Sequence, residues 1–221
     1  MKEIKILTPI GMLGYGIPED DYLRGLERNP DAIILDSGST DPGPYQLGLG
    51  CTLAKPEAYE RDLRVILAGL VQRKIPLIIG SAGGPGIAEH VDSLIGTIGT
   101  ICKELDIKRK IAAIYSDIDP QIVKEHFAQG RIESCSSSPP LKVQDIDSSV
   151  HIVAQMGAEP ILAALQQHPD VDIVVAGRAY DPSPYAAFCM MHDIEPGIYW
   201  HMAKIMECGA LCAEPKGAVM L

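Results

Sequence analysis

The chain has 221 residues, of which 47% are hydrophobic, and a formal charge of −10 at pH 7. Length and apolar content suit one large α/β domain, and the unopposed negative charge argues against a nucleic-acid partner. No stretch reaches the roughly 18 apolar residues of a membrane helix. We therefore expect no membrane partner. The 6 cysteines show no CxxC pair and no metal-ligand spacing, which is typical of a protein in the reducing cytoplasm.

Apolar runs typical of buried strands alternate with helical patterns along the chain. Strands are predicted at 4–8, 32–35, 77–79, 111–115 and 171–176. Helices are predicted at 56–73, 87–105, 148–168, 185–192 and 198–211, and two further helices are predicted to begin at residues 18 and 119. A loop rich in glycine and proline is predicted at 42–50. This alternation predicts a three-layer, Rossmann-like α/β fold with a mostly parallel sheet between two helical layers.

Residues 1–221 are interpreted as one domain whose last residues, 217–221, read as the beginning of another strand. We therefore expect either the front part of a longer protein, or a chain whose sheet is completed by another copy or by a partner subunit. The carboxyl ends of the strands are where an open α/β sheet binds its ligands. The residues that follow each predicted strand are accordingly the candidates for a site.

A glycine-rich turn, Gly80–Gly86, follows the third predicted strand and precedes a helix. Backbone N–H groups in this position bind anions, which makes Gly80, Ser81, Gly83 and Gly84 candidate substrate-binding residues. The turn lacks the Lys-Ser/Thr of a P-loop and the GxGxxG spacing of a dinucleotide site, so neither nucleotide nor NAD is expected. The alternative is a tight turn whose glycines serve close packing.

The second predicted strand ends in Asp36-Ser37-Gly38-Ser39-Thr40-Asp41. Asp36 lies nearest the sheet and is a candidate general base, while Ser37 and Ser39 could orient a substrate by hydrogen bonds. Several of these oxygens could instead hold a divalent cation. A third interpretation is a series of Asx and Ser turns that leads into a surface loop.

The fifth predicted strand is followed by Arg178 and Asp181. The arginine fork matches a carboxylate or phosphate, and Asp181 could move a proton, although the two could also form an ion pair that only holds the loop. Asp117, after the fourth strand, is a further substrate-binding candidate. Asp119 is expected to cap the next helix, and Cys208 to be a structural cysteine rather than a nucleophile.

Three of these segments together resemble the acyclic terpene utilisation family, the AtuA-like proteins. They are Gly80–Gly84, Ala176–Asp181 and Met206–Ala210. The resemblance implies a catabolic enzyme, with branched acyl-CoA or related carboxylic acids as substrates in some members, and it implies that members are longer proteins.

The leading hypothesis is a lyase, hydratase or isomerase that acts on a small anionic substrate, either a carboxylic acid or an acyl-CoA thioester, without a redox cofactor. Asp36 or Asp181 would move the proton, while Arg178 and the amides of the glycine turn would hold the anion. One alternative is a non-catalytic ligand-binding or assembly subunit. Another is a divalent-metal-dependent hydrolase that uses Asp36, Asp117 and Asp181, which makes a divalent metal the one cofactor that we consider.

Overall fold

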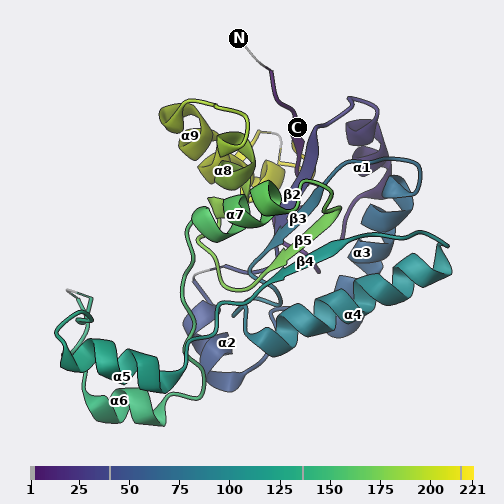
Figure 1. Cartoon of the computed structure of the whole chain (residues 1–221). Coiled ribbons are helices and arrows are strands. Elements are labelled where there is room, and N and C mark those ends of the chain that lie inside the picture. Colours follow the sequence, from purple (N-terminus) through teal and green to yellow (C-terminus); the bar gives the residue numbers. More distant parts are fainter. Residues whose placement is uncertain (1–2, 40, 136, 215) are drawn as a thin grey trace.

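A parallel sheet forms the centre of the computed structural model, which describes residues 3–39, 41–135, 137–214 and 216–221. Its strands are β1 (Ile6–Leu7), β2 (Ala32–Asp36), β3 (Leu77–Gly80), β4 (Ile111–Ile114) and β5 (Ile173–Ala176). They lie in the order β1-β2-β3-β5-β4, and every pair of neighbours is parallel (Figure 1). The predicted three-layer α/β fold is confirmed.

Two helical layers cover the sheet. One face packs against α1 (Glu19–Leu26), α3 (Pro56–Leu70) and α4 (Ala88–Glu104), and the other against α7 (Glu159–Gln167), α8 (Ser183–Met190) and α9 (Pro196–Met206). Successive side chains of a strand point to opposite faces, so Ile33 and Leu35 join the first core while Ile34 joins the second. Burial on both faces explains why β2 is an unbroken apolar run rather than an alternating one.

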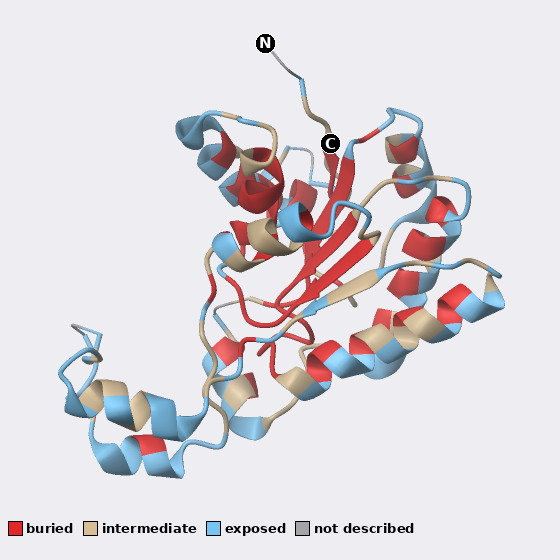
Figure 2. Ribbon diagram, in the orientation of Figure 1, coloured by how far each residue is buried: buried red, intermediate tan, exposed pale blue. Residues whose placement is uncertain are grey.

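The strand at one edge of the sheet, β4, is less buried than the others (Figure 2). The chain then leaves the sheet to form α5 (Pro120–Ala128) and α6 (Val143–Ser148), which pack against each other away from the sheet (Figure 1). In this arm the Asp119 carboxylate accepts a hydrogen bond from the N–H of Gln121 at 2.8 Å, which confirms the predicted helix cap.

The helix predicted at 148–168 is wrong in its first half, because α7 begins only at Glu159. The preceding residues are extended and pair with the loops that follow β4 and β5. The N–H of Ala154 donates to the carbonyl of Ser116 at 2.7 Å, and that of Met156 to the carbonyl of Arg178 at 3.0 Å. Hydrogen bonds to distant backbone thus replace those that a helix would have supplied locally.

Two other boundaries differ from the prediction. The loop expected at 42–50 contains α2 (Gly43–Leu49), which has a proline in its first turn and is capped at its C-terminus by Gly50 in the left-handed conformation. The helix expected at 198–211 ends at Met206 and is followed by the 3-10 helix η1 (Gly209–Cys212), since Gly209 has a φ of 58°.

The segment predicted to begin another strand, 217–221, forms an isolated antiparallel bridge between Met220 and Thr8, beside β1. Of the helices in the described part of the chain, none has the length and apolar content needed to cross a membrane.

Candidate active site

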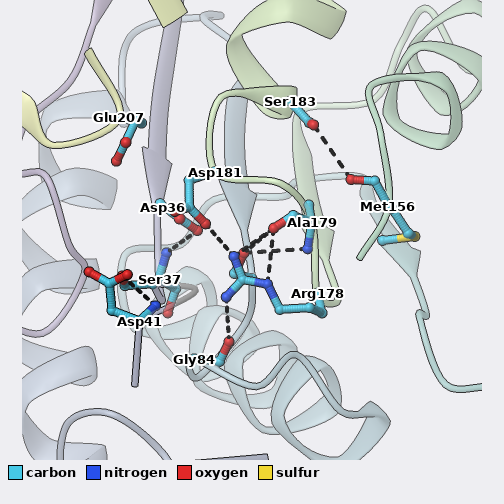
Figure 3. A network of polar contacts seen from close by, with 12 residues as sticks. Asp36, Ser37, Asp41, Gly84, Met156, Arg178, Ala179, Asp181, Ser183 and Glu207 are labelled. Carbon is cyan, nitrogen blue, oxygen red and sulfur yellow. Dashed lines mark hydrogen bonds and ion pairs between the residues drawn. The ribbon is translucent and has the colours of Figure 1, made fainter. Parts of the chain in front are cut away.

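Three loops meet at the carboxyl edge of the sheet because β2, β3 and β5 are neighbours. They carry Asp36, the glycine turn Gly80–Gly86, and Arg178 with Asp181 (Figure 3). Backbone hydrogen bonds join the loops, from the N–H of Ser37 to the carbonyl of Gly80 at 2.9 Å and from that of Ser81 to the carbonyl of Gly177 at 3.2 Å. The sequence candidates on these loops are therefore brought together in one buried polar cluster.

Arg178 and Asp181 form an ion pair inside this cluster. Both residues are buried, with exposed fractions of 5% and 6%. The guanidinium also donates to the carbonyl of Ala179, from Nε at 3.0 Å and from Nη2 at 2.6 Å, and to that of Gly84 at 3.0 Å. Arg178 therefore ties the β5 loop to the glycine turn, which is the holding role that the sequence allowed for this pair.

Asp36 is the most enclosed carboxyl group of the cluster, with 1% of the residue exposed. Its Oδ1 accepts the N–H of Ser37 at 2.9 Å, whereas Oδ2 has no hydrogen-bond partner among the described residues. Burial, and then the neighbouring Asp181 carboxylate, raise the pKa of Asp36 well above its usual value, against the opposing effect of Arg178. Asp36 consequently retains a proton at a pH where an exposed aspartate is ionised.

The glycine turn has an unusual backbone. Ser81 has a φ of 51°, a conformation that costs a non-glycine residue free energy and that recurs at functional sites. Its hydroxyl donates to the carbonyl of Ala179 at 3.3 Å and accepts from the N–H of the same residue at 3.4 Å. Gly86, with a φ of 71°, lies against the backbone of Arg178, where a Cβ atom would collide. The turn and the β5 loop are therefore closely packed and hydrogen-bonded to each other.

The amides of the turn mostly donate to protein acceptors. The N–H groups of Ser81, Ala82, Gly84 and Gly86 donate to backbone carbonyls. That of Gly83 donates to the Ser37 hydroxyl at 3.2 Å. Since a side-chain hydroxyl rotates more readily than backbone moves, Gly83 offers the amide most easily freed for an anion. Anion binding by this turn remains a prediction.

Two predicted residues lie apart from the cluster. Ser39 is partly exposed and accepts a hydrogen bond from the N–H of Asp41 at 3.3 Å. Asp117 is exposed after β4, where its backbone bridges Val153. Thr40, from the same predicted loop as Ser39, lies outside the described residues.

The metal hypothesis required three aspartates, Asp36, Asp117 and Asp181, to converge on one ion. Among the described residues there is no group of three His, Cys, Asp or Glu side chains that could hold a metal ion. Asp36 and Asp181 are buried together, whereas Asp117 is exposed on the far side of β5. This ligand set is therefore wrong for the described part of the chain.

A cleft of about 210 Å³ lies beside the cluster, with Arg178 in its wall. The remaining lining comes from α2, from the glycine turn and from the extended segment before α7: Gly43, Pro44, Leu47, Pro85, Val153 and Gln155. Most of these side chains are apolar. This cleft was not predicted from the sequence, because much of its wall comes from two segments whose secondary structure was predicted incorrectly, α2 and the residues before α7.

Glu207 is a buried carboxylate that sequence reasoning missed. It is 6% exposed, pairs with Lys204, and accepts a hydrogen bond from the thiol of Cys208 at 3.0 Å. Figure 3 draws it in the same view as Asp36 and Asp181, with no contact to either. Cys208 is exposed rather than buried, but partial burial of its thiol, together with Glu207, raises the pKa of that thiol to about 12, which makes it a poor nucleophile at neutral pH. The Lys-x-x-Glu spacing on a helix was the available signal.

The family described as "Acyclic terpene utilisation family protein AtuA" matches residues 55–215. The chain belongs to this family. The match includes the glycine turn, Arg178, Asp181 and Glu207, and it begins after Asp36. The name of the AtuA family refers to the utilisation of acyclic terpenes, which is a catabolic role. Neither the curated proteins nor the solved structures gave a match.

Proposed function

We propose that this AtuA-family protein is a catabolic enzyme of the lyase, hydratase or isomerase type. It would move a proton next to the carbonyl group of a small carboxylic acid or acyl-CoA thioester. The observation that carries this proposal is the Asp36–Asp181 pair at the carboxyl edge of the sheet. Asp36 has an unpartnered buried oxygen and a raised pKa, the combination by which functional carboxyl groups are recognised.

The two carboxyl groups have different environments. Arg178 forms an ion pair with Asp181, whereas burial favours the protonated form of Asp36. Two titratable groups whose environments differ in this way can serve as base and acid in one reaction. Asp181 would accept the proton from the α carbon, while the Asp36 hydroxyl would donate a hydrogen bond to the oxygen on which negative charge develops.

The cleft beside Arg178 would hold the hydrocarbon part of the substrate. Pro44, Leu47, Pro85 and Val153 give it an apolar wall, and its volume of about 210 Å³ suits a short branched chain. The family name, which refers to branched acyclic hydrocarbons, supports the same substrate class. Because Asp36 is enclosed, the proposal requires the residues that cover it to move when substrate binds.

The proposal is tested by incubating the protein in D₂O with 3-methylbutanoyl-CoA or 3-methylbutanoate and following deuterium at the α carbon by NMR. We expect exchange with the wild-type protein and its loss in Asp36→Asn and Asp181→Asn. Asp41→Asn is the matched control, because this exposed carboxylate lies in the loop that follows Asp36.

The other outcomes separate the alternatives. Exchange that survives both substitutions at the pair refutes the assignment of acid and base. Saturable binding of the thioester without exchange indicates a non-catalytic binding subunit. Activity that is lost in a chelator and restored by magnesium indicates a metal-dependent enzyme with ligands other than the three aspartates.

A further inference from the structure

The outer edge of β4 has unpaired backbone groups. β4 is the last strand of the sheet, and it pairs only with β5 among the described residues. The carbonyls of Lys110 and Ile114 accept hydrogen bonds from the β5 segment, at 3.0 and 2.7 Å. Because alternate residues of a strand direct their N–H and C=O groups to opposite sides, those of Ile111, Ala113 and Tyr115 point away from the sheet.

The sequence of this edge does little to prevent pairing. Proteins usually protect an exposed edge with lysine, proline, a bulge or a covering element. The strand itself, Ile111-Ala112-Ala113-Ile114, contains neither a charge nor a proline, and Ala113 is exposed. An edge of this kind can form backbone hydrogen bonds with a strand of another chain.

Both helical layers leave open space beside this edge. On one face, a groove of about 640 Å³ runs along β4 and is lined on its α7 side by Pro160, Ala163 and Ala164, among other residues. On the opposite face, α4 presents Gly96 and Gly99, where an added Cβ atom would meet nothing within 4 Å. These glycines share a helix face with Asp92, which accepts a hydrogen bond from the Tyr115 hydroxyl at 2.7 Å. Small residues on both sides leave room for a second backbone with its own helices.

We propose that β4 pairs antiparallel with β4 of a second copy of this chain, about a twofold axis at Ala113, so that one sheet continues through the dimer. Only residues that point outward can exchange hydrogen bonds, which restricts the register. Centring the pair on Ala113 places Ile111 opposite Tyr115 of the second copy, and Tyr115 opposite Ile111 of the second copy.

Charge complementarity favours a second copy in this orientation. Exposed Lys108 lies before the strand, exposed Lys110 at its start forms an ion pair with Asp170 of the same chain, and exposed Asp117 and Asp119 follow its end. Antiparallel pairing brings Lys108 of each copy towards the acidic end of the other, whereas parallel pairing would bring the acidic ends together. The edge is thus complementary to itself.

The test uses the residue on the axis. In Ala113→Glu and in Ala113→Lys, each introduced charge faces its own copy, and we expect the dimer dissociation constant to rise by about tenfold or more in sedimentation equilibrium. Mixing the two variants should restore dimers, because the charges are then opposite. Ala128→Glu, at an exposed position of α5, is the matched control and should dimerise as the wild type does.

Hydrogen exchange of the wild-type protein gives a second measurement that needs no variant. The amides of Ile111, Ala113 and Tyr115 should become protected as protein concentration rises, whereas those of Ala112 and Ile114 are protected throughout by β5. A monomer at all concentrations overturns the proposal. So does a dimer that neither charge at position 113 weakens, or one in which the outward amides exchange freely.

Discussion

Replacing Arg178 by methionine tests whether its ion pair holds the candidate site together. The substitution leaves the Asp181 carboxylate buried without its cation, at a cost of about 3–5 kcal/mol. The carbonyls of Gly84 and Ala179 also lose the hydrogen bonds from the guanidinium, at about 1 kcal/mol each. The total is about 5–7 kcal/mol, against about 5–15 kcal/mol for the unfolding of a typical domain. We therefore expect Arg178→Met to unfold at a much lower urea concentration, as followed by circular dichroism.

The companion variant separates the charge from the packing. Arg178→Met combined with Asp181→Asn no longer buries an unpaired charge, so it should be more stable than Arg178→Met alone. Arg64, an exposed arginine that forms ion pairs with two exposed carboxylates, is the matched control, and Arg64→Met should hardly change the unfolding midpoint. A loss below about 1 kcal/mol in Arg178→Met would refute the reasoning, as would a double variant no more stable than the single one.

Two further predictions concern protonation. Because the folded protein raises the pKa of Asp36, the contribution of this residue to the free energy of unfolding should be greatest below the pKa of an unfolded aspartate and should be lost as the pH rises through the folded value. The difference in melting temperature between the wild type and Asp36→Asn should therefore change across this pH range, and a difference that does not vary with pH would contradict the prediction. Cys208 and Cys135 are both exposed, so the raised pKa of the Cys208 thiol should make it react with iodoacetamide more slowly than Cys135. Glu207→Gln should accelerate this reaction, and equal rates before and after the substitution would show that Glu207 does not hold the thiol proton.

Much of the fold follows from local patterns. The apolar runs identify the strands because parallel strands inside a sheet, such as β2 and β5, are buried on both faces. Asp36, Arg178 and Asp181 are conspicuous because each follows such a run. The carboxyl-edge rule then places them on one side of the sheet without any knowledge of its order.

The rest depends on interactions between distant segments. No local pattern indicates that β5 lies between β3 and β4, although this order brings Arg178 to the glycine turn and leaves Asp117 outside the cluster. The residues before α7 read as helix, but their amides bond to loops beyond β4 and β5. Glu207 reads as a helix-end residue until the folded chain encloses it.

The place of β5 in the sheet also links assembly to function. β4 precedes β5 by about sixty residues in sequence, yet its neighbour in the described sheet is β5 alone, so it has no strand to pair with until β5 is inserted. Arg178 and Asp181 follow directly after β5. During synthesis, therefore, the segment that completes the sheet emerges together with the ion pair of the site, and a chain truncated before β5 would lack both.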